Sequence, residues 1–187
     1  MVNASALRPG DVVVVRTPWT LAGAMIRLGA MLHGERPVDH VAVVVDVLPS
    51  GDVELIEGRP SGVGSALLHG SGYTLVSSNA AQPKTDARRA EIVRLADAMV
   101  GTGYDWEAIA VDFLGALWLR QPHRPSWNPA KPPRHVVCSS MASWLYRAPS
   151  VGLVEPAGED RWCTPWAWQQ FNRRQEWRTV PTAGEKP

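Results

Sequence analysis

The sequence predicts a single α+β domain, and three observations support this prediction. The chain has 187 residues, enough to bury one sizeable core without requiring a second. Runs of β-branched residues in the first half predict strands, and apolar residues spaced three and four apart predict helices, most of them in the second half. The domain is expected to span residues 1–178, followed by a polar tail at 179–187.

The first two predicted elements are a strand and a helix. A turn signal at Arg8-Pro9-Gly10-Asp11 precedes Val12–Val15, and this β-branched run predicts a strand at about 11–16, buried on both faces. A short amphipathic helix is predicted from Thr20 to Met31, because apolar residues recur at helical spacing before His33-Gly34 ends the pattern. The apolar positions of this helix are Leu21, Ala24, Met25, Leu28 and Leu32.

A β-hairpin is the next predicted element. Val41–Leu48 and Val53–Ile56 are both rich in β-branched residues, and Pro49-Ser50-Gly51-Asp52 between them suits a chain reversal. Gly58–Gly72 is rich in glycine and serine, so it is predicted to be a loop. A short strand is predicted after it, at Tyr73–Ser77.

Helical patterns dominate the second half of the chain. A helix is predicted over 86–100, with Thr85 or Asp86 as its N-cap, and another over 105–119. The residues expected to form the apolar face of the first are Ile92, Leu95, Ala96, Met99 and Val100. Two shorter helices are predicted near the C-terminus, one beginning at Cys138 and one over 165–171.

A proline-rich segment at 121–133 separates these helices. Its five prolines require an irregular backbone, and the segment could be a lid, an insertion or a partner-binding loop.

Composition argues against nucleic acid as a partner. Lys and Arg number 19 against 18 for Asp and Glu, so the chain has no basic field that could hold a phosphate backbone. The N-terminus lacks the pattern of a signal peptide, and no apolar stretch approaches the about 20 residues of a membrane span. We therefore expect no transmembrane segment, and a location in the bacterial cytoplasm or in a phage particle.

Cys138 is the candidate nucleophile. It sits where a helix is predicted to begin, and there free amides and the positive end of the helix dipole stabilise a thiolate. The backbone amide of Cys138 could also hold the oxyanion that forms when a carbonyl is attacked. The alternative is a core-facing cysteine without chemistry. Cys163 is the second cysteine, and free thiols are expected at both positions, although sequence leaves a single bridge open.

His40 is the candidate general base. It opens the strand at Val41–Leu48, and a strand holds an imidazole rigidly enough to take a thiol proton repeatedly. The alternative is a histidine that merely ends a strand. The other histidines have less well-supported backbones, and they are His33, His69, His123 and His135.

These residues belong to a series of short motifs that resembles the permuted branch of the NlpC/P60 superfamily, in the YiiX-like group. In order, the motifs are Leu7-Arg8-Pro9-Gly10-Asp11-Val12-Val13, Asp39-His40-Val41-Ala42-Val43-Val44, Leu55-Ile56-Glu57, Gly103-Tyr104-Asp105-Trp106, Val137-Cys138-Ser139-Ser140 and Thr164-Pro165-Trp166. The histidine strand precedes the cysteine helix, as in the permuted branch. The resemblance implies a papain-like fold, with a small antiparallel sheet packed against helices and the cysteine at the start of the central helix. It also implies an amide or ester hydrolase, or an acyltransferase.

The resemblance also places the family's third polar residue at Glu57, whose carboxylate would orient the imidazole of His40. The simplest hairpin strains this assignment. A tight turn at Ser50-Gly51 would pair Glu57 with Val44, about four residues or roughly 13 Å along the strand from His40. Contact would need a bulge or a longer loop, and the alternative is a solvated carboxylate. Asp39 should point to the opposite face and form hydrogen bonds locally.

Tyr104 and Ser139 are candidate substrate-binding residues. Tyr104 matches a family position, although a tyrosine at a helix start is often a core anchor. The tryptophans, including Trp162, Trp166 and Trp168, could line a cleft or simply fill the core. A zinc site from His40, His135, Cys138 and Cys163 is disfavoured because these residues lack paired ligand spacing, so no metal or cofactor is expected.

Three functional hypotheses follow from the sequence. The first is a cysteine hydrolase that cleaves amide bonds in bacterial cell-wall peptides through an acyl-enzyme. The second is a hydrolase or acyltransferase acting on lipid-type esters or amides. The third is a non-catalytic structural module of a phage particle, such as a tail component, in which segment 121–133 and the polar tail dock against neighbouring proteins.

Overall fold

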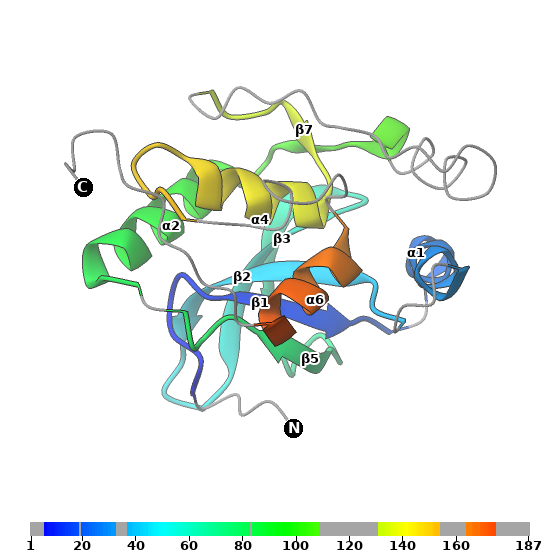
Figure 1. Cartoon of the computed structure of the whole chain (residues 1–187), viewed down its shortest axis with the longest axis horizontal. Coiled ribbons are helices and arrows are strands. Elements are labelled where there is room, and N and C mark those ends of the chain that lie inside the picture. Colours follow the sequence, from blue (N-terminus) through cyan, green and yellow to red (C-terminus); the bar gives the residue numbers. More distant parts are fainter. Residues whose placement is uncertain are drawn as a thin grey trace.

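A five-stranded antiparallel sheet forms the centre of the molecule (Figure 1). The computed structural model describes residues 6–18, 20–32, 37–82, 84–108, 131–153 and 164–174. The strands are β1 (Val12–Arg16), β2 (His40–Val47), β3 (Val53–Arg59), β4 (Gly62–Leu67) and β5 (Thr74–Ser78). They lie in the order β4-β3-β2-β1-β5, and every neighbouring pair is antiparallel.

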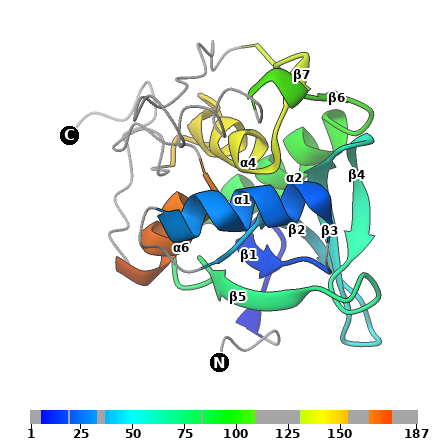
Figure 2. The same cartoon turned by 90° about the vertical axis from the view of Figure 1, so that its right-hand side faces the viewer.

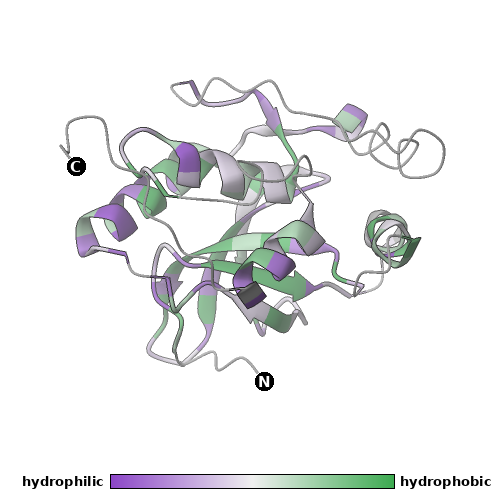
Figure 3. Ribbon diagram, viewed as in Figure 1, coloured by the Kyte–Doolittle hydropathy of each residue, from purple (hydrophilic) through white to green (hydrophobic). Residues whose placement is uncertain are grey.

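The central strands are buried on both faces. In β1, Val12 and Val14 pack into one hydrophobic cluster, whereas Val13 and Val15 pack into another on the opposite face. This arrangement explains why β1 is an unbroken β-branched run rather than an alternation of apolar and polar residues. Figure 3 shows the hydrophobic character of this strand and its neighbours.

Three helices share one hydrophobic cluster with this sheet, and two views show them packed beside it (Figures 1 and 2). They are α2 (Asp86–Ala98), α4 (Cys138–Arg147) and α6 (Pro165–Arg174). Trp168 of α6 is fully buried between Tyr146 and Phe171, with ring centroids 5.4 and 6.0 Å away. The edge-to-face contact of Trp168 with Tyr146 holds α6 against α4, whereas its contact with Phe171 lies within α6.

Helix α1 (Leu21–Leu32) stands apart from these three, beside the end of the sheet where β2 begins (Figure 1). The position of this helix was predicted correctly, but part of the apolar face that was expected to be buried is exposed. Leu28, Met31 and Leu32 are 47, 61 and 57% exposed, whereas Ala30 is buried. The rest of the described chain therefore covers only part of the apolar face of α1.

Most other predicted elements are confirmed. β1, the hairpin of β2 and β3, β5, and helices α2, α4 and α6 all lie where the sequence places them, within a few residues. Thr85 is the N-cap of α2, where its side chain accepts a hydrogen bond from the Arg88 amide. Val100 lies beyond the end of α2 and is 53% exposed, so its assignment to the apolar face was wrong.

The predicted loop at Gly58–Gly72 is wrong, because it contains β4. This edge strand pairs with β3 along its whole length, and Val63 and Ala66 are buried. Half of its residues are glycine or serine, so the pairing with β3 rather than local propensity makes it a strand. A two-stranded parallel pair, β6 (Gly103–Tyr104) with β7 (His135–Val136), was also not predicted.

The confirmed fold class is thus α+β, with an antiparallel sheet and several helices. No helix in the described part of the chain is long and apolar enough to cross a bilayer. Three predicted features lie wholly or largely outside the described residues, namely the body of the helix over 105–119, the proline-rich segment up to residue 130, and the tail at 179–187.

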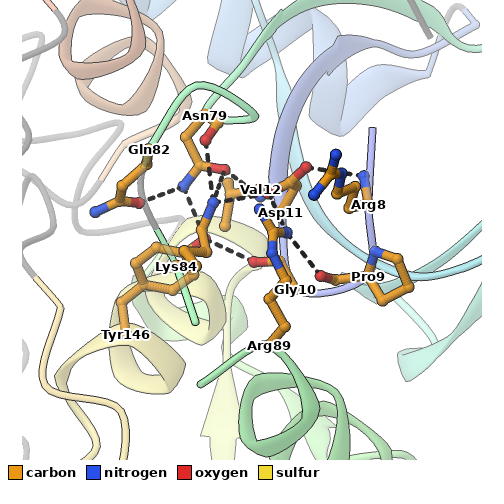
Figure 4. A network of polar contacts seen from close by, with 10 residues as sticks. All are labelled: Arg8, Pro9, Gly10, Asp11, Val12, Asn79, Gln82, Lys84, Arg89 and Tyr146. Carbon is orange, nitrogen blue, oxygen red and sulfur yellow. Dashed lines mark hydrogen bonds and ion pairs between the residues drawn. The ribbon is translucent and has the colours of Figure 1, made fainter. Parts of the chain in front are cut away.

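A buried polar network ties the start of β1 to the helices (Figure 4). The Asp11 carboxylate accepts hydrogen bonds from Lys84 Nζ at 2.7 Å and Arg89 Nη1 at 2.8 Å. Tyr146 of α4 donates its hydroxyl to the Gly10 carbonyl at 2.8 Å and accepts from Asn79 Nδ2 at 2.7 Å. Asp11 therefore anchors both α2 and the segment before it to the sheet.

Candidate active site

His40 and Glu57 form a direct pair at the beginning of β2. Nε2 of His40 lies 2.6 Å from Oε2 of Glu57. His40 is 8% exposed and Glu57 is fully buried, so the alternative of a solvated carboxylate at position 57 is wrong.

The hairpin register explains this contact. The turn is looser than a two-residue reversal, because the Leu48 amide bonds to the Asp52 carbonyl at 2.9 Å. A register shift between Val44 and Asp46 moves β3 further along β2, so that Val43 pairs with Ile56. The expected pairing of Glu57 with Val44 is therefore wrong. Glu57 lies about two residues from His40 along the neighbouring strand, on the same face, within reach of a diagonal contact.

The second oxygen of Glu57 has two further donors. Tyr73 donates its hydroxyl to Oε1 at 2.7 Å, and Arg59 donates Nε to the same atom. Burial alone would raise the pKa of Glu57, but the hydrogen bond and charge of His40, followed by Tyr73 and Arg59, hold that pKa below its usual value. Glu57 is therefore a buried, ionised carboxylate with all its charge compensated by neighbours.

Cys138 is the first residue of α4, at the position where sequence placed it. Val137 is the N-cap, and Ser140 Oγ accepts from the Val137 amide at 2.9 Å, which fixes the entry into the helix. The Cys138 amide lies in the first turn, where no intrahelical acceptor exists. Cys138 is a free cysteine and is only 2% exposed.

Gly58 lets the start of α4 approach β3 closely. A Cβ at this position would lie 3.2 Å from the Cys138 nitrogen and 3.3 Å from the Val137 carbonyl carbon. Any larger residue would press against the amide that begins the helix. The glycine thus brings Cys138 to the strand that carries Glu57.

The side chain of Cys138 lies close enough to the imidazole of His40 for its charge to act on the ring. Because Nε2 faces Glu57, Nδ1 is the ring nitrogen left for the thiol. Burial would lower the pKa of His40, but the charge and hydrogen bond of Cys138, followed by those of Glu57, raise it to about 10. The ring is thus protonated at neutral pH and lies between two acceptors of its protons.

The partners of the Asp39 carboxylate are not local in sequence, so the expected local hydrogen bonding was wrong. This carboxylate accepts from the Thr17 hydroxyl at 2.7 Å and from Arg27 Nη2 at 2.6 Å. A Cβ at Gly23 would lie only 2.6 Å from the same carboxylate. Asp39 therefore ties α1 to the strand that begins with His40.

A cavity of about 430 Å³ opens beside His40. The segment before α1 and the helix itself contribute Pro18 and Ile26 to its lining, and Tyr73 and Tyr104 also line it. Burial, followed by the nearby Cys138 charge, raises the pKa of Tyr104, so its hydroxyl keeps its proton beside the site. The structure therefore places Tyr104, but not Cys138 itself, among the described residues at the cavity surface.

The remaining candidates lie away from the cavity. Ser139 is 1% exposed, and its carbonyl accepts from Trp168 Nε1 at 3.4 Å. His69 pairs with Asp52 at an exposed turn, 3.0 Å apart. His135 is exposed on β7.

No metal site is formed by the part of the chain that the structure describes. Within the described ranges, no three His, Cys, Asp or Glu side chains gather where they could hold a metal ion. His33, His123, Trp162 and Cys163 lie outside those ranges.

Sequence reasoning missed two residues of the site, Arg59 and Tyr73. Arg59 follows Glu57 by two positions, and residues two apart in a strand share a face, so this pairing could have been found. Tyr73 comes from the segment before β5 and carries no local signal, because only the folding of the sheet brings it to Glu57.

Comparison with known proteins gives no match, either to a protein-family model or to a curated sequence.

Proposed function

We propose that this protein is a papain-like cysteine hydrolase of the permuted NlpC/P60 type, which cleaves amide or ester bonds through an acyl-enzyme. The observation that carries the proposal is the 2.6 Å contact of His40 with buried Glu57, beside a helix start that brings Cys138 against the strand that carries Glu57. A nucleophile, a base and a carboxylate that orients the base are the three parts that covalent acyl transfer requires.

The reaction begins with an ion pair. In the proposed reaction the protonated ring of His40 pairs with the thiolate of Cys138, which is the nucleophilic form of cysteine. The sulfur attacks the substrate carbonyl, a sulfur–carbon bond forms, and the carbonyl electrons move to oxygen. The Cys138 amide at the helix start is placed to donate a hydrogen bond to this oxyanion.

Collapse of the oxyanion breaks the bond to the leaving group. His40 gives its proton to the departing amine or alcohol, and the acyl group remains on Cys138. Water then attacks the thioester carbonyl while His40 takes the proton of that water. Breaking the sulfur–carbon bond releases the acid, and the His40 imidazolium and the Cys138 thiolate are restored.

The first candidate substrate is an amide bond in a bacterial cell-wall peptide. The resemblance to the NlpC/P60 superfamily supports this choice, and the cavity beside His40 offers space for the acyl side of the peptide.

The second candidate is a lipid-type ester or amide, with hydrolase or acyltransferase chemistry. Apolar surface at the site is the observation in its favour. Pro18, Ile26 and Pro60 line the cavity, and exposed leucines and a methionine continue along α1. An acyl chain would find apolar contacts on both surfaces.

Trapping of the acyl-enzyme tests the proposal. The protein is incubated with purified cell wall and with panels of peptide amides and acyl esters, and both products and intact protein are weighed by mass spectrometry. We expect product release together with a mass increase on Cys138, and neither in Cys138→Ala. The absence of product and of adduct with every substrate would favour the structural role in a phage particle.

A further inference from the structure

The carboxylate of Glu57 is held at both oxygens. Oε2 lies 2.6 Å from Nε2 of His40, while Oε1 accepts from the hydroxyl of Tyr73 at 2.7 Å and from Nε of Arg59. The carboxylate cannot rotate without breaking at least one of these contacts. The mechanism described above uses the contact to His40 and leaves the other two unexplained.

Arg59 is itself fixed in place. Its Nη2 donates to the carbonyl of Ser65 on β4 at 2.8 Å, so the guanidinium bridges two strands. The ring of Tyr73 is tilted against that of His40, with the two centroids 5.9 Å apart. Both Arg59 and Tyr73 line the cavity, so this arrangement forms part of the wall beside the substrate position.

Arg59 also balances the negative charge of Glu57. In the reactive state the site holds two anions, Glu57 and the Cys138 thiolate, and one cation at His40. The guanidinium of Arg59 is the second cation beside Glu57, with its side chain 36% exposed. Without it the buried carboxylate would lose a compensating charge, and a buried carboxylate that loses its partner takes up a proton more readily.

Tyr73 supports the same carboxylate without charge. Burial, followed by the charge of Glu57, raises the pKa of Tyr73, so its hydroxyl remains a donor across the working pH range. A neutral donor and a cation on one oxygen favour the ionised form of Glu57 more than either alone.

We propose that Arg59 and Tyr73 are positioning residues that keep Glu57 ionised and oriented toward Nε2 of His40. This inference rests on the proposed function, since orienting His40 matters only if His40 serves Cys138. It adds two members to the predicted Cys138, His40 and Glu57 site, and both act through Glu57 rather than on substrate.

The test measures the protonation of Glu57 and the reactivity of Cys138 separately. Arg59→Gln and Tyr73→Phe are compared with the unmodified protein by the ¹³C carboxyl signal of Glu57 against pH, and by the rate of alkylation of Cys138 with iodoacetamide at pH 5 and pH 8. We expect Glu57 to take up its proton at higher pH in both variants. The ratio of the pH 5 rate to the pH 8 rate should fall about tenfold in Arg59→Gln, and less in Tyr73→Phe.

Two further variants sharpen the comparison. Arg59→Lys keeps the cation, so it should recover most of the rate at pH 5. Arg94→Gln is the matched control, because it removes an arginine that pairs with Glu91 on the exposed face of α2, 2.7 Å apart. That control should leave both measurements unchanged.

An unchanged Glu57 titration in Arg59→Gln and Tyr73→Phe overturns the inference. If Arg59→Gln fails to fold, Tyr73→Phe and Arg59→Lys decide by the same criterion. Failure of the proposed function looks different: Cys138 of the unmodified protein would then show no enhanced alkylation, while the carboxyl signal of Glu57 would still report whether its two donors hold it ionised.

Discussion

At the scale of single residues, the candidate site depends on His40. The surroundings of this histidine act on its pKa in opposite directions. Burial disfavours a charged ring, whereas Cys138 and Glu57 favour it, and the two partners prevail. A histidine that merely ended a strand would not need a buried carboxylate on one side and a thiol on the other. The arrangement is instead typical of a base that alternately gives and takes a proton.

The protonation of His40 is directly measurable. In protein with ¹³C-labelled histidine, the His40 signal, assigned by its absence in His40→Gln, should remain that of the protonated ring at pH 8 and titrate near pH 10 because its pKa is raised to about 10. Cys138→Ser and Glu57→Gln should each move the midpoint to lower pH, since each removes an anion that favours the charged ring. Cys138→Ser should have the larger effect, because Cys138 contributes more to the raised pKa.

A midpoint near the ordinary value of about 6.5 in the unmodified protein would contradict this account of the site. So would a midpoint that neither substitution moves.

At the scale of elements, the start of β1 is the joint between sheet and helices (Figure 4). The side chains of Lys84 and Asp11 are both fully buried, and that of Arg89 of α2 is only 11% exposed. Burial lowers the pKa of Lys84 to about 8, although the Asp11 charge opposes that shift. The joint lies at the N-terminal end of β1, whereas Val15 near the other end pairs with His40, so the network holds the sheet without touching the site.

Removal of this joint should cost stability. Asp11→Ala leaves Lys84 and Arg89 without their shared carboxylate, and breaking a buried ion pair in this way typically costs about 3–5 kcal/mol. We expect that loss in the free energy of unfolding, measured by urea denaturation. Asp97→Ala is the control, because Asp97 is exposed on α2 and its replacement should change stability by less than about 0.5 kcal/mol. Equal effects of the two substitutions would show that the network contributes nothing.

In the hairpin of β2 and β3, the strands could be predicted from sequence but their register could not. Both strands were predictable, because their β-branched runs are unambiguous. The register was not, since a bulge near Val45 depends on how β2 meets both of its neighbours. The looser turn and this bulge together bring Glu57 about two residues closer to His40 than a tight hairpin would, so the strand pattern alone could not establish the contact.

At the scale of the whole molecule, the order of elements was readable and their mutual placement was not. Cys138 at a helix start and His40 at a strand start were visible as local patterns, and so was the α+β class. Tyr73 joined the site only through the return of the chain before β5, whereas Arg59 shares a face of β3 with Glu57 and was predictable. Helix α1 was predicted, but the ion pair of its Arg27 with Asp39 was not, because only folding brings the helix beside the start of β2.

The central claim, that Cys138 is an activated nucleophile, has one direct test. Iodoacetamide labelling at pH 7, read by mass spectrometry of peptides, should modify Cys138 at least about tenfold faster than Cys163, and His40→Ala should abolish that preference. Slow and equal labelling of both cysteines would contradict the enzyme hypothesis and leave the structural role.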